Sequence, residues 1–293
     1  MGNTLMKPEV TSISVANDLI ASGSEDRSVR ITDMNGNLVR EFPKHHESKV
    51  EFVSLSSNGK YLISCGGYGD YSPKVIKLET NEEIVLESLD YGKGGHTANV
   101  WCVSISMNGD LAVSCSRDNN IIIWKLDWNN KSYQIMKEYK RNEDVNAVEL
   151  SSNGKFLLTG SDSDILRLIN LETDEEEIFE GHKGNVNAID LSENGNIIVS
   201  GGDDKDIFVW EKNNEEWNKT VLEGHTDIVT AVKISDNNKY IVSGSEDNNV
   251  IIWENGKEKQ RIPTNGDINS VAIYNNYVLY NDRNNVSQVK LDV

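Results

Sequence analysis

The sequence of 293 residues contains little cysteine: three residues, Cys65, Cys102 and Cys115. Each lies in an apolar run of the kind that forms β-strands. An odd, small number of cysteines in a chain of this length indicates a reducing compartment and buried free thiols rather than disulfides. We find no signal peptide, and no apolar run approaches the roughly 18 residues that a membrane-spanning helix needs. We therefore expect a cytoplasmic protein that does not enter a membrane.

Positive charge is also scarce. The 29 lysine and arginine residues are outnumbered by 47 aspartate and glutamate residues, which gives a net charge of −18 and a pI near 4.7. Nucleic acids and anionic membranes are polyanions, so this balance argues against both as the main partner. No pair of histidines or cysteines has the spacing of metal ligands, and no glycine-rich segment fits a phosphate-binding loop. We expect neither a metal nor a cofactor.

The chain also lacks a convincing helical period, and strand-like alternation dominates instead. A segment such as HTDIVTAVKIS recurs, with an anchor residue about 40–50 positions after the previous one, which is the period of propeller blades. The turns that follow are rich in Asn-Gly and similar pairs, which close hairpins. The seven anchors are Val10, Val50, Val100, Val145, Val186, Val229 and Ile268.

Each copy predicts four strands. The expected fold is therefore all-β: a single domain, 1–293, forming a seven-bladed β-propeller of four-stranded antiparallel blades. An open sheet edge is avoided if residues 3–7 supply the outer strand of the last blade. The predicted blades are approximately 9–43, 49–90, 99–140, 144–180, 185–223, 228–262 and 267–293 plus 3–7.

Three segments share one spacing of serine, aspartate and tryptophan: VSCSRDNNIIIW at 113–124, VSGGDDKDIFVW at 199–210 and VSGSEDNNVIIW at 242–253. Each of the three segments follows a Gly-His pair. On these motifs the sequence resembles the WD-repeat family, and the resemblance covers nearly the whole chain. In that family the histidine, serine, aspartate and tryptophan of a blade form a buried hydrogen-bonded set, which we call a tetrad. The resemblance implies the tetrads His96/Ser114/Asp118/Trp124, His182/Ser200/Asp204/Trp210 and His225/Ser243/Asp247/Trp253, and His46 matches the first position in the second copy.

A set of histidine, aspartate and serine also suggests a catalytic triad. We reject that interpretation because the set repeats three times and each copy includes a tryptophan. A different enzyme could use rim carboxylates such as Asp144 with Asp162 for acid–base chemistry. Against it, no nucleophile lies beside a base, and the residues expected to face the channel are small. These are Ser12, Ala147, Ala188, Ala231 and Ser270.

The resemblance also implies that one rim of the ring collects three positions from each blade: the residues before and after the anchor, and the residue before the turn aspartate. Many of them are acidic. The set is either a solvated acidic surface or a ring that prefers basic segments of a partner. The candidate partner-binding residues at these positions are Glu51, Trp101, Arg117, Asp144, Asn146, Asp162, Asn187, Asp203, Glu246 and Asp267.

Trp101 is the one aromatic residue at a position that is otherwise polar, which indicates an exposed anchor for a partner. Tyr68, Tyr71 and Tyr91 lie in irregular segments expected on the same rim, although they could instead pack the long loops. The favoured function is a non-enzymatic scaffold or adaptor that binds proteins or peptides on this rim. The alternatives are a reader of modified basic tails, if these four aromatic side chains form a cage, and the enzyme that uses rim carboxylates.

Overall fold

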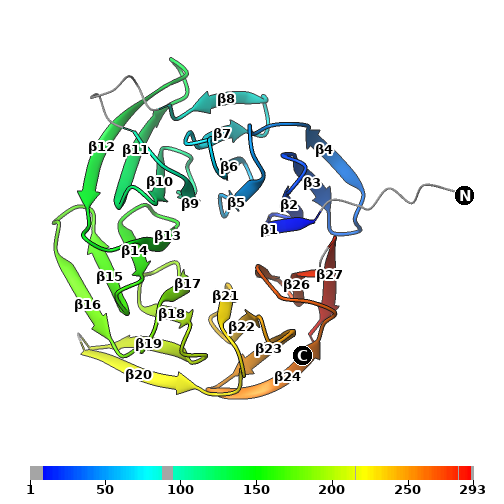
Figure 1. Ribbon diagram of the computed structural model, residues 1–293, viewed down its shortest axis with the longest axis vertical. Coiled ribbons are helices and arrows are strands. Elements are labelled where there is room, and N and C mark those ends of the chain that lie inside the picture. The colour runs from blue at the N-terminus through cyan, green and yellow to red at the C-terminus, as the bar shows by residue number, and fades with distance from the viewer. Residues whose placement is uncertain (1–8, 88–94, 215, 283, 292–293) are drawn as a thin grey trace, which may run out of the picture.

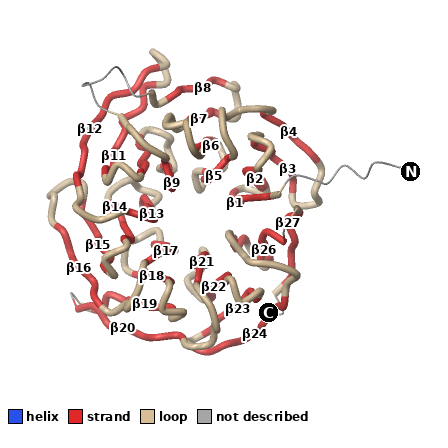
Figure 2. The backbone as a smooth tube through the Cα atoms, in the orientation of Figure 1, coloured by secondary structure: helices blue, strands red, loops and turns tan. Residues whose placement is uncertain are grey.

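The computed structural model describes residues 9–87, 95–214, 216–282 and 284–291, and in these ranges the chain forms 27 β-strands and no helix. The strands make seven sheets arranged in a ring around a central channel (Figures 1 and 2). The predicted all-β, seven-bladed propeller is therefore confirmed. Blades 1 to 3 comprise β1 (Val10–Ala16), β2 (Leu19–Ser24), β3 (Val29–Asp33), β4 (Leu38–Phe42); β5 (Val50–Leu55), β6 (Tyr61–Gly66), β7 (Lys74–Lys77), β8 (Glu82–Val85); and β9 (Val100–Ile105), β10 (Leu111–Ser116), β11 (Asn120–Asp127), β12 (Ser132–Lys140).

The remaining four blades follow the same order, with the first strand innermost and its hairpin partners placed successively outward (Figure 1). They comprise β13 (Val145–Leu150), β14 (Phe156–Ser161), β15 (Ile165–Asn170), β16 (Glu176–Glu180); β17 (Val186–Leu191), β18 (Ile197–Gly202), β19 (Ile207–Asn213), β20 (Glu216–Leu222); β21 (Val229–Ile234), β22 (Tyr240–Ser245), β23 (Asn249–Glu254), β24 (Lys257–Pro263); and β25 (Val271–Tyr274), β26 (Tyr277–Asp282), β27 (Asn285–Lys290).

The last blade has three strands among the described residues. The outer strand that we predicted from residues 3–7 lies outside the described ranges. The ring nevertheless closes through its inner strands: the backbone N–H of Ile13 donates to Ser270 Oγ at 3.1 Å, and Ser270 Oγ donates to the Ile13 carbonyl at 3.2 Å. Ile13, Ala272 and Leu279 share an apolar cluster across this junction.

The hydrophobic core lies between neighbouring blades, where each anchor residue contacts the sheet before it. Val229 approaches Gly201 so closely that a Cβ on the glycine would lie 2.4 Å from Val229 Cγ1, and Ile268 would be 2.3 Å from a Cβ at Gly244. Real Cβ atoms do not come this close to a neighbouring carbon, so a glycine is needed here. This contact explains the Ser-Gly pairs of the repeat.

A β-bulge recurs at the start of the inner strand in the first six blades. In each of them the pairing register skips the residue after the anchor. A bulge leaves its extra residue outside the ladder and re-aims that side chain. One end of the ring therefore collects six such side chains, those of Thr11, Glu51, Trp101, Asn146, Asn187 and Thr230.

Candidate functional site

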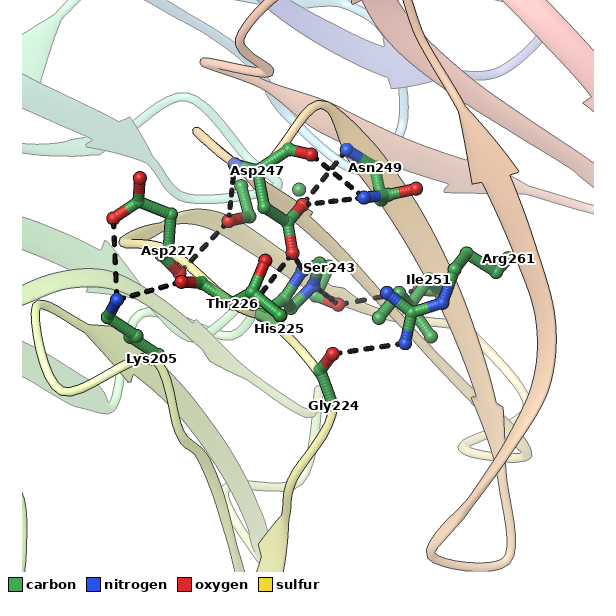
Figure 3. Close-up of polar contacts among 12 residues, drawn as sticks. Lys205, Gly224, His225, Thr226, Asp227, Ser243, Asp247, Asn249, Ile251 and Arg261 are labelled. Carbon is green, nitrogen blue, oxygen red and sulfur yellow. Dashed lines mark hydrogen bonds and ion pairs between the residues drawn. The ribbon is translucent and has the colours of Figure 1, made fainter.

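Blade 6 contains a complete tetrad of hydrogen bonds. Trp253 Nε1 donates to Ser243 Oγ at 2.9 Å. Ser243 Oγ lies 2.7 Å from His225 Nε2, and His225 Nδ1 lies 2.8 Å from Asp247 (Figure 3). Asp247 also accepts the backbone N–H of Thr226 at 2.9 Å. Because the indole can only donate, the serine hydroxyl must donate onward to the imidazole, which in turn donates to the carboxylate. This series of hydrogen bonds connects the turn that holds Asp247 to the third strand of the blade, which holds Trp253.

Blade 3 has the same arrangement. Trp124 Nε1 donates to Ser114 Oγ at 2.8 Å, Ser114 Oγ lies 2.7 Å from His96 Nε2, and His96 Nδ1 lies 3.2 Å from Asp118. Burial opposes ionisation of Asp118, but hydrogen bonds from His96 and from the Thr97 N–H outweigh it, so the pKa of Asp118 is lowered. The same balance lowers the pKa of the turn aspartate in blade 6.

Blade 2 holds a set of this kind that the sequence pattern did not reveal. His46 Nε2 lies 2.9 Å from Ser64 Oγ, and His46 Nδ1 lies 2.8 Å from Asp70. The serine follows the histidine by 18 residues, as in the other blades, but Asp70 follows by 24 instead of 22. The longer loop after β6 shifts the aspartate by two positions, which hid it from a fixed spacing.

Blade 5 departs from the expected tetrad. His182 lies 2.8 Å from Ser200 Oγ and 2.9 Å from Asp204, as predicted, but the buried indole N–H of Trp210 has no hydrogen-bond partner. Our expectation that Trp210 donates to Ser200 is therefore wrong. Phe208 occupies a position held by isoleucine in blades 3 and 6, and its ring stacks on His182 at 4.3 Å and meets the Trp210 ring edge-on. This larger side chain accounts for the missing contact.

Blades 1 and 4 use arginine pairs instead. In blade 1 the turn aspartate, Asp26, binds Arg30 of the neighbouring strand at 2.6 Å. In blade 4 Arg141 stands where blades 2, 3, 5 and 6 have histidine, and it binds Glu176 of the outer strand at 2.8 Å. These blades keep the fold without an indole in the set.

The tetrad serines are closed to solvent. Ser64, Ser114, Ser200 and Ser243 each have 0% exposure, and the four histidines bound to them are buried. A substrate could not reach these hydroxyl groups. In the ranges that the structure describes, no cluster of three or more His, Cys, Asp or Glu side chains could hold a metal ion, and no helix is long and apolar enough to cross a membrane.

The aromatic candidates on the rim differ in exposure. Trp101, held in its bulge, is 36% exposed, and Tyr68, in the loop between β6 and β7, is 83% exposed. Tyr71 is half-buried, and Tyr91 lies outside the described residues. No ring contact within the described ranges includes Trp101, Tyr68 or Tyr71. Tyr68 is therefore not a side chain that packs its own loop.

Several polar candidates are engaged within the ring. Asn146 Nδ2 donates to the carbonyl of the next blade's anchor valine at 3.4 Å, and Asn187 Nδ2 donates to Asp203 at 2.6 Å. Glu51 forms an ion pair with Lys49 at 3.1 Å. These contacts hold the bulge residues in place around the channel mouth.

Acidic side chains gather on blades 5 to 7. The pKa of Glu246 is raised, first by partial burial and then by the negative charges of Asp267, Asp227 and Asp203. Lys205 lies 3.8 Å from Asp227 and is half-exposed. The negative charges of these three aspartates therefore act together on Glu246, although Lys205 lies near one of them.

The remaining rim candidates lie on blades 3 and 4. Arg117 and Asp162 are exposed, and Asp144 is half-buried. The Asp162 N–H donates to the Asp144 carbonyl at 3.0 Å, so both residues stand at one end of their blade.

The central channel contains a cavity of about 350 Å³. We expected only small residues there, and Ala147 and Ala188 do line it, as does the rim candidate Trp101. Three larger side chains that the sequence reasoning missed also line the cavity: Phe52, Glu149 and Lys233. The signal was present in the repeats: VELS, IDLS and VKIS place a charged residue at the same position of three successive inner strands.

The chain belongs to the WD40 family. The family profile described as "WD domain, G-beta repeat" matches residues 4–33, 36–72, 89–125, 132–170, 174–211 and 217–254, which together cover well over half of the sequence. The seventh blade lies beyond the last match, and its hairpins are evident in the structure.

Relatives with curated names align with parts of the chain. Actin-interacting protein 1 of Caenorhabditis elegans is 28% identical over 156 residues, which is 52% of this chain and 25% of that protein. Small ribosomal subunit protein RACK1 of Schizosaccharomyces pombe is 30% identical over 42% of this chain and 43% of that protein. Guanine nucleotide-binding protein subunit beta of Zea mays is 27% identical over 53% and 42%. The chain thus spans between a quarter and a half of these relatives.

Proposed function

We propose that this protein is a non-enzymatic, cytoplasmic scaffold that binds a partner protein through the rim carrying the β-bulges. The partner contributes a basic segment, which lies across the channel mouth. Neither nucleic acid nor a membrane is the main partner, because the chain carries a net charge of −18.

The observation that carries the proposal is the exposed indole of Trp101 on an acidic rim. The bulge fixes its backbone, so it is presented as a rigid aromatic anchor, and residues of this type dominate binding hot spots. Tyr68 adds a second exposed ring on the adjacent blade. The acidic arc around Glu246 supplies charge complementary to lysine and arginine.

The names of the relatives support a role in protein interaction. The name of one refers to interaction with actin, that of a second to the small ribosomal subunit, and that of a third to the beta subunit of a guanine nucleotide-binding protein. Each of these names describes a protein that interacts with another protein or forms part of a larger assembly. We carry that general role, and no specific partner, to this chain.

The inaccessibility of the tetrad serines supports a non-enzymatic role. Each histidine that could activate a serine is held between that serine and an aspartate inside a blade. The arrangement repeats in four blades, which fits a stabilising function and not a single catalytic centre.

The test is affinity capture from native lysate with immobilised wild type, Trp101→Ala and Met107→Ala. Met107 is a matched control, because it is 38% exposed and follows β9 at the opposite end of the same strand. We expect Trp101→Ala to weaken capture of the partner at least tenfold, with Met107→Ala unchanged and both variants as stable as wild type to within about 1 kcal/mol. Equal capture by wild type and a folded Trp101→Ala would overturn the proposal.

A second arm tests the charge. Adding Asp144→Asn to Trp101→Ala should weaken capture further, and raising the salt concentration should weaken capture by the wild type, since screening reduces attraction between opposite charges. Capture that is insensitive to both changes would remove the preference for basic segments.

A further inference from the structure

The channel cavity has an apolar wall near its mouth. Trp101 and Phe52 lie on blades 3 and 2, and the methyl groups of Ala147, Ala188 and Ala231 follow around the ring. These three alanines stand one residue beyond the bulge in their strands. Such a wall suits the aliphatic stem of a long side chain.

Charged side chains lie deeper in the channel. Glu149, Asp190 and Lys233 occupy the same position in the inner strands of blades 4, 5 and 6, three residues beyond the bulge. At the rise of a β-strand, that is about 10 Å further along the strand. A group that enters from the rim meets the apolar wall first and the charges second.

The three charges do not cancel. Lys233 Nζ binds Asp190 at 2.7 Å, and the second oxygen of Asp190 accepts the N–H of Ile234 at 2.7 Å. Glu149 lies 3.9 Å from Lys233 Nζ, at the limit of an ion pair, and its side chain is 21% exposed to the cavity. The lysine is therefore held mainly by Asp190, and it reaches the Glu149 carboxylate, which lines the cavity, only at the longer distance.

The ionisation of Glu149 agrees with this geometry. Burial, together with the negative charge of Asp190, raises the pKa of Glu149 to about 7, although the positive charge of Lys233 and a hydrogen bond from Ser104 oppose the shift. A second cation beside Glu149 would lower that pKa and favour the charged form. With two carboxylates and one ammonium, the three side chains carry a net charge of −1 when Glu149 is ionised.

We propose that the channel receives one basic side chain, lysine or arginine, from the partner segment. Its stem lies against Trp101 and Phe52, and its charged end pairs with Glu149. The inference rests on the proposed function, since the segment that supplies this side chain lies across the rim.

The experiment selects binders from a library of displayed random 12-residue peptides, using wild type, Glu149→Gln and Glu216→Gln. Glu216 is a matched control because it is exposed on the outer strand β20, far from the channel. Glu149→Gln should remain folded, since it replaces a carboxylate whose ionisation burial disfavours, and circular dichroism will check this. We expect wild type and Glu216→Gln to select peptides with one invariant lysine or arginine, and Glu149→Gln to lose that invariant position.

A thermodynamic cycle then measures the contact. For the best peptide, replacing the invariant lysine by norleucine, or arginine by citrulline, should weaken binding to wild type at least tenfold and to Glu149→Gln less than twofold. Basic peptides selected equally by wild type and Glu149→Gln would overturn the channel inference and leave the proposed rim function intact. Selected peptides without any basic preference would overturn the channel inference together with the basic segment proposed for the rim.

Discussion

Blade 6 and blade 4 share one strand order but hold their strands by different means. In blade 6 the tetrad joins His225, Ser243, Asp247 and Trp253 out of reach of water. In blade 4 the corresponding positions carry arginine, threonine, serine and isoleucine, and half-buried ion pairs such as Arg167–Glu143 at 2.6 Å take the place of the tetrad. The common backbone shows that hairpins, bulges and packing between blades are sufficient for the fold. The tetrad adds local stability to the blades that have one.

The largest expected difference in stability between blades 6 and 4 comes from removing the turn carboxylate of blade 6. Asp247→Ala leaves His225 and the Thr226 N–H without their buried acceptor, so we expect a loss of about 3 kcal/mol in the free energy of unfolding. Ser163→Ala, at the matching exposed position of blade 4, should cost less than about 0.5 kcal/mol. Urea unfolding of both variants gives the two values. Equal losses would mean that the tetrad adds no stability to blade 6 beyond what blade 4 has without it.

Blade 5 allows a finer comparison, because its indole N–H is unpaired. Trp253→Phe removes a buried hydrogen bond from blade 6, whereas Trp210→Phe removes a donor that has no partner. Both lose similar packing, so we expect Trp253→Phe to cost about 1 kcal/mol more than Trp210→Phe. If Trp210→Phe lowers the free energy of unfolding more than Trp253→Phe does in the same urea series, the Trp210 indole N–H must form a hydrogen bond.

We expect a smaller effect, on the pH dependence of stability, from one of two adjacent histidines of blade 2. His46 is bonded on both ring nitrogens, whereas His45 Nε2 is buried without a partner. Burial, together with His46 and Lys74, lowers the pKa of His45 to about 3. Below pH 6.5 the unfolded chain therefore binds a proton at His45 that the folded chain does not, and stability is lost as the pH falls.

The variant His45→Gln removes that penalty. Between pH 7.5 and 5.5 the wild type should lose about 1 kcal/mol more than His45→Gln, measured by urea unfolding at both pH values. Parallel losses would show that His45 is protonated in the folded protein or is accessible to water.

The sequence was sufficient for the seven blades because hairpin turns and anchor residues recur at a near-constant interval. It was also sufficient for the hydrogen-bonded sets of blades 3 and 6, where spacing and residue type agree. It failed at Asp70, since two extra loop residues broke the spacing, and at Trp210, since the effect of Phe208 depends on how two rings pack.

The channel was harder to predict for another reason. One residue past the bulge, most inner strands carry alanine or serine, and this position alone predicts a channel lined by small side chains. The charges of Glu149, Asp190 and Lys233 become a cluster only when three strands, far apart in sequence, converge on one axis. Distances of this kind follow from the closed ring and not from any one repeat.

The most direct measurement for the whole account is hydrogen–deuterium exchange on the protein alone and with the partner isolated by capture. We predict new protection at the channel mouth, in segments around Tyr68, Trp101, Asn146, Asn187 and Glu246, with exchange in the outer strands β12, β16 and β20 unchanged. Protection confined to those outer strands, with the mouth still exchanging freely, would contradict it.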